Sequence, residues 1–172
     1  MKCFALLLVS LTLGFVQVYA AELFHEAALT GTDGALIKAG GVKTDSSMIT
    51  KKKYFFIYFS AHWCPPCRAF TPKLVEFYKK NAANGDFELL FVSRDKDQAA
   101  MDAYMTEMKM PWIGLSLENK QGAALSEKYG VSTIPFLVLL DEKDNVLESS
   151  YNDEKYMGHQ APLEKYESLH KK

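Results

Sequence analysis

The sequence predicts an α/β fold in which a central mixed β-sheet is flanked by helices on both faces. Three apolar runs, at 54–60, 87–93 and 136–140, are bounded by charged or turn-forming residues, as expected for buried strands. Between them, apolar residues recur every three or four positions, which is typical of helices that pack one face on a sheet. A polar turn after the third run predicts a hairpin, so the strand directions are mixed.

Length and composition favour one globular domain. The chain has 172 residues, of which 48% are hydrophobic and 24% charged, with a formal net charge of -1. This balance gives no overall electrostatic reason to expect nucleic acid or an anionic membrane as a partner. The densest basic run, residues 51–53, is interpreted as a solvated turn before a strand.

Residues 1–20 are interpreted as a secretory signal peptide, followed by a single domain at 21–172. One lysine precedes an apolar run that ends at about Val16, and Val18 and Ala20 occupy the positions that a signal peptidase reads. The run is shorter than the roughly 20 residues of a membrane-spanning helix, although an uncleaved anchor is the alternative. Cleavage would remove Cys3. The expected location is periplasmic or secreted, with a bacterial periplasm favoured, and no membrane span is expected after cleavage.

The first half of the domain is predicted to hold the centre of the sheet. A short strand or hairpin at 35–43 lies at the edge, and the aromatic run 54–60 is a central strand covered on both faces. A helix follows from about Cys67 to Lys80, and Pro72 is expected to kink it. Its apolar stripe consists of Phe70, Leu74, Phe77 and Tyr78.

The second half of the domain continues the alternation of strands and helices. Helix 97–108 is opened by an acidic residue, and its methionines are interpreted as core rather than as a soft-metal surface, because three of its four large apolar residues share one stripe. The elements predicted after residue 86 are a strand at 87–93, helices at 97–108 and 121–129, a strand at 136–140, a strand near 146–151 and a helix at 161–169.

A cysteine pair lies where the central strand meets its helix, in "FSAHWCPPCRAFTP" (59–72). Without the signal, Cys64 and Cys67 are the only cysteines, and the loop they close is too small to stabilise the fold much. A sulfur at a helix N-terminus is favoured as thiolate, so Cys64 is the expected nucleophile and Cys67, one turn later, the resolving thiol. Pro65 and Pro66 suit the first helical turn and stiffen the loop.

The stretches "FFIYFSAHWCPPCRAFTPKLVEFYKK" and "FELLFVSRDKDQAAMDAYMTEMKMPW" resemble the nucleoredoxin and tryparedoxin branch of the thioredoxin-like superfamily. The similarity covers roughly residues 50–141, and WCPPC followed by Arg is its most specific part. It implies a thioredoxin fold and dithiol–disulfide exchange, with no cofactor besides the Cys64–Cys67 couple and no metal.

The resemblance also implies a substrate-binding surface. Trp63, Pro65 and Pro66 would meet the partner beside the nucleophile. Pro135 matches a proline that the superfamily holds in cis, which would turn the backbone of Ile134 toward the substrate chain. Pro72 matches the proline that kinks the thioredoxin helix, and Gly158 matches a small residue in the last active-site loop.

One position departs from thioredoxin itself. The buried aspartate that lies six residues before the first cysteine is replaced by Tyr58, a poor base at its ordinary pKa near 10, so we assign no general base. His62 and Arg68 could favour the thiolate or be bystanders. Asp95 could lie at the rim of the site or cap the next helix, and we favour the cap.

The function expected from these observations is an exported thiol–disulfide oxidoreductase that acts on protein disulfides. The expected partners are protein thiols and disulfides and an upstream thiol reductant, with the chain a monomer. A reductase is favoured, because Thr133-Ile134-Pro135 resembles the corresponding loop of the reductants.

Other functions stay open at this stage. They are a disulfide oxidase or isomerase of the same fold, a binding protein or chaperone whose cysteines are incidental, and a module in which the two thiolates bind metal. Structural zinc needs four ligands, and neither a second cysteine pair nor the scattered histidines His25, His159 and His170 supply them.

Overall fold

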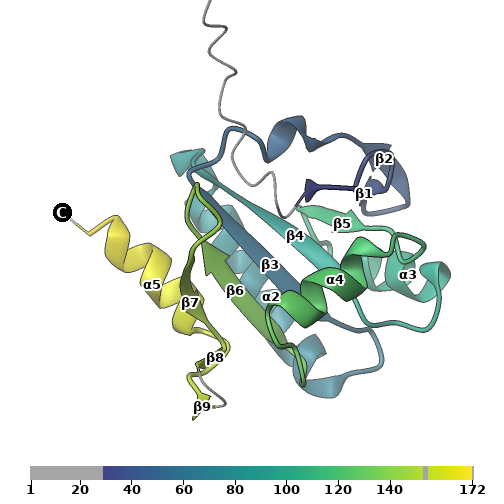
Figure 1. Cartoon of the computed structure of the whole chain (residues 1–172). Coiled ribbons are helices and arrows are strands. Elements are labelled where there is room, and N and C mark those ends of the chain that lie inside the picture. The colour runs from purple at the N-terminus through teal and green to yellow at the C-terminus, as the bar shows by residue number, and fades with distance from the viewer. Residues whose placement is uncertain (1–28, 153–154, 172) are drawn as a thin grey trace, which may run out of the picture.

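The computed structural model describes residues 29–152 and 155–171, and a seven-stranded sheet forms its centre (Figure 1). The strands of this sheet are β1 (Leu36–Lys38), β2 (Val42–Thr44), β3 (Tyr54–Ser60), β4 (Phe87–Ser93), β5 (Ile113–Leu115), β6 (Phe136–Leu140) and β7 (Val146–Ser149). Their order is β2-β1-β5-β4-β3-β6-β7. The predicted signal peptide lies outside the described residues.

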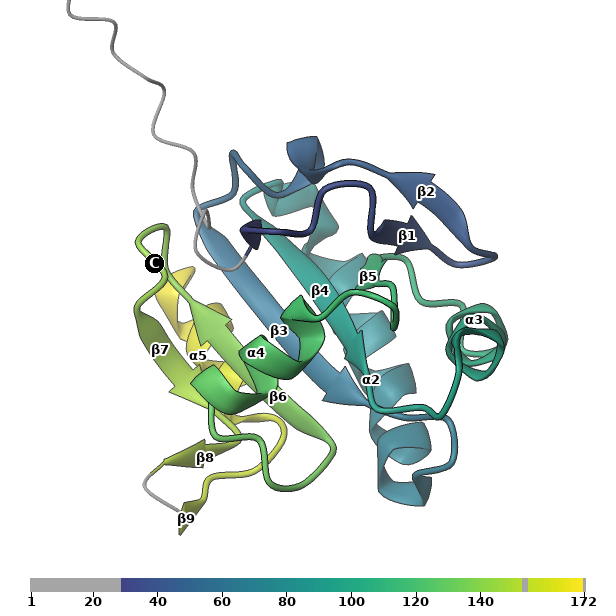
Figure 2. The same cartoon turned by 45° about the vertical axis from the view of Figure 1, so that its right-hand side comes forward.

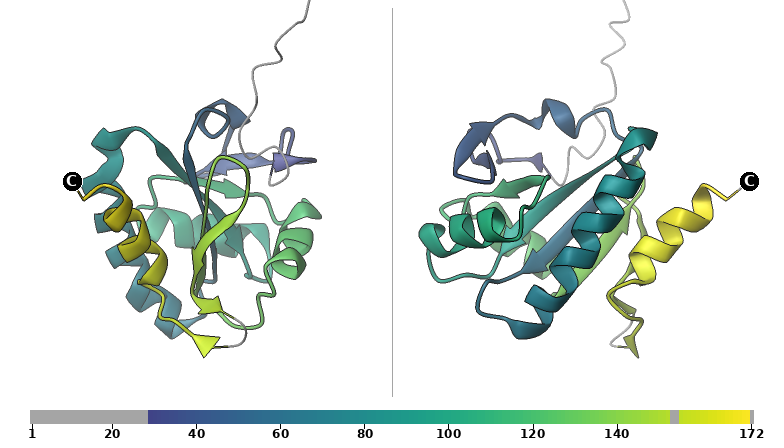
Figure 3. Two further views of the ribbon diagram at one scale, coloured as in Figure 1. Left: turned by 60° about the vertical axis from the view of Figure 1, so that its left-hand side comes forward. Right: turned by 180° about the vertical axis from the view of Figure 1, so that it is seen from behind.

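Four helices of the described residues cover the two faces of this sheet, as predicted. They are α2 (Pro65–Asn81), α3 (Gln98–Glu107), α4 (Gln121–Lys128) and α5 (Ala161–Leu169). One core cluster joins α2, α3 and α5 to one face of the sheet, and the other joins α4 to the opposite face. Figure 2 shows α4 in front of the sheet, and the right-hand view of Figure 3 shows α2 and α5 on the other side.

Strand β3 is the centre of this arrangement because all seven of its residues are buried. Phe56 and Tyr58 contribute to the cluster on the α2 face, while Phe55, Ile57 and Phe59 contribute to the cluster on the α4 face. This alternation is what a strand covered on both sides requires. β3 pairs in parallel with β4 and antiparallel with β6, which confirms the mixed sheet.

Strand β5 was not predicted. It is inserted between β1 and β4, and three residues are too short a run to show a periodicity. A Cβ atom at its Gly114 would lie 2.7 Å from the Met101 methyl group and 2.9 Å from the Met105 sulfur. Helix α3 therefore packs directly against the strand backbone, and its buried methionines belong to the core, as predicted.

The predicted strand 146–151 is divided into β7 and a separate short hairpin of β8 (Tyr151–Asn152) with β9 (Lys155–Tyr156). The interruption is the buried Ser150, whose hydroxyl accepts a hydrogen bond from the Leu137 amide (2.9 Å).

Helix α2 continues without a break through Pro72, the proline that was expected to kink it. Within the described residues, no helix is both long and apolar enough to span a membrane.

Candidate active site

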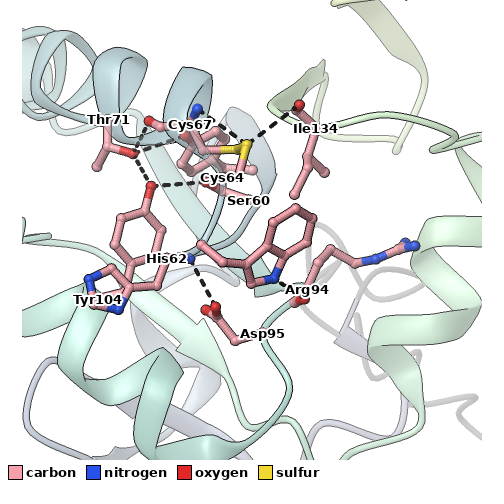
Figure 4. The surroundings of a disulfide bond; sticks show 11 residues. Ser60, His62, Cys64, Cys67, Thr71, Arg94, Asp95, Tyr104 and Ile134 are labelled. Atoms are coloured by element: carbon pink, nitrogen blue, oxygen red, sulfur yellow. Dashed lines mark hydrogen bonds between the residues drawn. A yellow bond between two sulfur atoms is a disulfide. The ribbon is translucent and has the colours of Figure 1, made fainter.

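The Cys64–Cys67 disulfide lies where β3 ends and α2 begins, as the sequence predicts (Figure 4). Cys64 is the N-cap of α2, and its Sγ accepts a hydrogen bond from the Cys67 amide (3.4 Å). The two Cα atoms are 5.2 Å apart. Cys64 is 3% exposed and Cys67 is fully buried, so an incoming sulfur can reach only Cys64 without a rearrangement.

A second chain segment, seventy residues further on, completes the surroundings of Cys64. The Cys64 Sγ lies 3.7 Å from the Ile134 carbonyl oxygen. The Ile134–Pro135 peptide bond is cis, as expected. Figure 4 shows the Ile134 carbonyl turned toward the disulfide sulfur.

A groove of about 530 Å³ runs beside these atoms. It brings together four of the predicted substrate-binding residues, Trp63, Pro65, Pro66 and Ile134, whereas Pro135 is buried behind them. Trp63 is 64% exposed, and its indole N–H donates to the Arg94 carbonyl oxygen (3.1 Å), which fixes an apolar ring at the rim. The groove can therefore hold an extended segment against the Cys64 sulfur.

Beneath the disulfide, four buried hydroxyl groups form one hydrogen-bonded network. The Thr71 hydroxyl donates its single proton to the Cys67 carbonyl oxygen (2.9 Å). It must then accept from its other partners, Tyr58 (2.9 Å) and Tyr104 (2.6 Å). The Tyr104 oxygen in turn accepts from the Ser60 hydroxyl (3.0 Å). Every proton of this network points toward the backbone of Cys67.

The network explains what Tyr58 does where thioredoxin has its aspartate. Burial raises the pKa of Tyr58 further above its ordinary value. The phenol is therefore a neutral donor to Thr71 and no proton acceptor at neutral pH. The position contributes to the shape and rigidity of the α2 N-terminus rather than to proton transfer.

On the α3 side, one carboxylate contacts both basic side chains that flank the cysteine motif. Glu107 lies 2.8 Å from His62 Nε2 and 2.7 Å from Arg68 Nη2. Hydrogen bonds from Arg68 and His62 lower the pKa of Glu107 below its ordinary value. The His62 ring also stacks on Tyr104, with centroids 5.3 Å apart. Arg68 is thus paired with a carboxylate beside the cysteine motif.

The favoured interpretation of Asp95 as a helix cap was wrong. Asp97 caps α3 by accepting from the Ala100 amide (2.8 Å). The Asp95 carboxylate instead accepts from the His62 amide (2.9 Å) and from the Ser93 hydroxyl (2.8 Å). It therefore holds the loop that leads into the cysteines, which was the alternative at the rim.

The remaining predicted residues lie away from the sulfur atoms or outside the described chain. His170, at the end of α5, bonds Asp86, whereas His159 lies against Phe70, and burial lowers its pKa. Gly158 adopts a φ of 99°. Among residues 29–152 and 155–171, no group of three or more His, Cys, Asp or Glu side chains is placed to hold a metal ion. His25 is not in the described part.

Sequence reasoning missed Thr71, Arg94, Tyr104 and Glu107 as residues of the site. Thr71 carried a signal, since a threonine four residues after Cys67 in a helix can bond back to that carbonyl. The other three are separated from the cysteines by 27 residues or more along the chain, counted from Cys67 to Arg94. Only the packing of α3 and the end of β4 brings them in.

The chain is similar to proteins of known families. Residues 52–146 match the sequence model of a family described as thioredoxin-like. The chain is 49% identical over 121 residues to probable nucleoredoxin 1 of Arabidopsis thaliana, covering 70% of this chain and 20% of that protein. It thus spans only about a fifth of that relative.

Two shorter proteins match over most of their length. Tryparedoxin of Trypanosoma brucei brucei is 38% identical over 114 residues, which cover 66% of this chain and 76% of the tryparedoxin. The crystal structure of thioredoxin from Wuchereria bancrofti has a TM-score of 0.63 and 34% identity, covering 78% of this chain and 92% of that one.

Replacing Thr71 with valine should destabilise the fold through the hydroxyl network. Thr71→Val keeps the side-chain shape but leaves the Tyr58 hydroxyl without its acceptor, and an orphaned buried donor costs about 1–3 kcal/mol. Thr71→Ser, the matched control, keeps the hydroxyl and should lose at least about 1 kcal/mol less than the valine variant. Urea unfolding measures both, and equal losses would show that the network contributes nothing.

Proposed function

Because the chain belongs to the thioredoxin-like family, we propose that it is a thiol–disulfide oxidoreductase that exchanges electrons with protein disulfides through Cys64 and Cys67. The observation that carries the proposal is the position of the Cys64 Sγ. It is a helix N-cap, it lies 3.7 Å from the Ile134 carbonyl oxygen, and it lines the groove. This is a nucleophile held beside a surface that can bind a polypeptide.

The reaction proceeds in two exchanges. The Cys64 thiolate attacks one sulfur of a substrate disulfide, forming a mixed disulfide and releasing the other sulfur as a thiolate that takes a proton from solvent. The Cys67 thiolate then attacks the Cys64 sulfur, closing the Cys64–Cys67 disulfide and releasing the second substrate thiol. Two electrons pass from the protein dithiol to the substrate disulfide.

Several features of the site support this sequence of steps. The Cys67 amide, which donates to the Cys64 Sγ, and the helix dipole at the start of α2 stabilise negative charge on Cys64. The buried Cys67 is shielded from other disulfides until the first exchange brings one to its neighbour. Since Tyr58 is no proton acceptor, the Cys67 proton passes to solvent rather than to Tyr58.

Cysteine substitutions test the two roles. Cys64→Ser should lower the rate of insulin disulfide reduction, with dithiothreitol as electron source, to the rate without protein. Cys67→Ser should still attack but should accumulate as a mixed disulfide with its substrate, visible as a mass increase on non-reducing gels. If Cys64→Ser were as active as the wild type, the proposed function would be wrong.

The direction proposed is reduction of substrate disulfides by a chain that an upstream thiol reductant recharges. The resemblance of the 133–135 loop to the reductants supports it. Thioredoxin-like reductants have reduction potentials of about -270 mV, and strong oxidants of the same fold have potentials of about -120 mV. Equilibration of the Cys64–Cys67 couple with glutathione should give a potential nearer the first value. A potential near the second would favour the oxidase or isomerase instead.

We also propose export, with the mature chain acting as a monomer in the periplasm or outside the cell. The composition of residues 1–20 supports export. When the whole chain is expressed in a secreting host, N-terminal sequencing of the exported protein should begin at Ala21. Retention of residues 1–20 on a membrane-bound product would instead show an uncleaved anchor.

A further inference from the structure

We propose that Arg94 is a specificity-determining residue that selects acidic polypeptide substrates, by binding a carboxylate that lies a few residues from the substrate cysteine. The inference rests on the proposed function, since it concerns what binds in the groove beside Cys64. The established parts of the site leave the Arg94 side chain without a role.

The backbone of Arg94 is fixed to the active site from both sides. Its amide donates to the Ser60 carbonyl oxygen (2.8 Å), at the end of β3. Its own carbonyl oxygen accepts the indole N–H of Trp63 (3.1 Å). The guanidinium group therefore projects from a rigid point beside the nucleophile's own loop, and only the exposed side chain can adjust to a ligand.

The charge of Arg94 is not balanced by a carboxylate in the described part of the chain. Its guanidinium donates to the neutral hydroxyl of Ser126 (3.2 Å). The neighbouring carboxylate of Asp95 is used by His62 and Ser93, and Figure 4 shows the Arg94 and Asp95 side chains pointing apart. Arg68, on the other side of the cysteines, is by contrast paired with Glu107.

Within the described residues, Arg94 is also the one charged residue that lines the groove beside Cys64. The rest of the groove is lined by residues 63–66 and by residues 131–134. A carboxylate that enters this groove meets one cation and no negatively charged residue. Its other neighbours are mainly apolar, and in such surroundings a charge-assisted hydrogen bond is stronger than in water. Charge complementarity therefore favours an anionic occupant.

The shape of the surface favours a polypeptide over a small thiol. A second depression, of about 510 Å³, continues beyond Arg94 between the end of β4 and α4. Its charged lining consists of Arg94 and Lys120 with Asp95 and Glu118, so the two signs are balanced there. An extended chain could occupy both depressions and pass Arg94 on the way.

The geometry also sets the place of the carboxylate. A substrate joined to Cys64 lies next to the Ile134 carbonyl, and the Trp63 indole, bonded to the Arg94 carbonyl oxygen, lines the same groove. An extended chain advances about 3.3 Å per residue, and alternate side chains share a face. A side chain two residues from the substrate cysteine would thus project about 7 Å along the groove, past the indole.

The test uses three capped peptides of the form X-Gly-Cys-Gly-X, with X as Asp, Asn or Lys, each activated as a neutral 2-thiopyridyl disulfide. Attack by the Cys64 thiolate breaks that disulfide, joins the peptide to Cys64 and releases thiopyridone, whose absorbance gives the second-order rate. We expect the reduced wild-type protein to react about threefold faster with the Asp peptide than with the Asn peptide, as an exposed ion pair allows. This preference should shrink as salt is added.

Substitutions assign the preference to Arg94. Arg94→Gln should bring the ratio of the Asp and Asn rates to about one, and Arg94→Glu should make the Lys peptide the fastest. Lys43→Gln is the matched control, because it removes one exposed positive charge on β2, at the far edge of the sheet, and should keep the wild-type ratio. Circular dichroism verifies that each variant is folded.

The outcomes separate this inference from the proposed function. The role of Arg94 would be overturned if Arg94→Gln kept the preference for the Asp peptide, or if Lys43→Gln lost this preference to the same extent. Either result would leave the oxidoreductase activity intact. If Arg94 increased the rate with glutathione disulfide but not the rate with the Asp peptide, the assignment to polypeptide substrates would be overturned. If the wild type reacted with every peptide no faster than Cys64→Ser does, the proposed function itself would fail.

Discussion

The antiparallel register of β3 and β6 is the constraint on which the site depends. Phe59 lies opposite Phe136, so the chain that leaves β3 and the chain that enters β6 meet at the same edge of the sheet. Cys64 follows Phe59 by five residues and Ile134 precedes Phe136 by two, and their atoms meet at 3.7 Å. A slip of one residue would exchange the two buried faces of β6, so burial on both sides fixes the register and with it the site.

The same burial decides what lies beneath the disulfide. Tyr58 is covered on a strand with no exposed residue, where an ionised group would need a partner and a hydroxyl needs only hydrogen bonds. Thr71 and Tyr104 supply those bonds and connect α2 and α3 to β3. The thioredoxin fold thus accommodates a neutral network where thioredoxin has a buried acid. The cost is the loss of an internal proton acceptor for Cys67.

The two sides of the cysteine motif differ in charge balance. On the α3 side, Glu107 forms an ion pair with Arg68 and a hydrogen bond with His62, and so ties the loop before Cys64 to helix α2. On the groove side, Arg94 donates to the neutral Ser126. The Arg68–Glu107 pair makes the first side a structural clamp, whereas Arg94, which has no carboxylate partner in the described part of the chain, can interact with a ligand. This asymmetry is consistent with substrates approaching along the groove.

The sequence by itself determined the buried strands, the helix that begins at the cysteines and the cis proline, because each depends on a local pattern or motif: an apolar run, an N-terminal proline, a family signature. Only the tertiary structure decided the rest. β5 has three residues and is a strand only because β1 and β4 lie on either side of it. Asp95 could not be distinguished from a cap until the loop of His62 was seen against it, and Glu107 and Arg94 became neighbours of the cysteines through helix and strand packing. Local patterns specify elements, but contacts between residues far apart in the chain exist only once the sheet order and register are set.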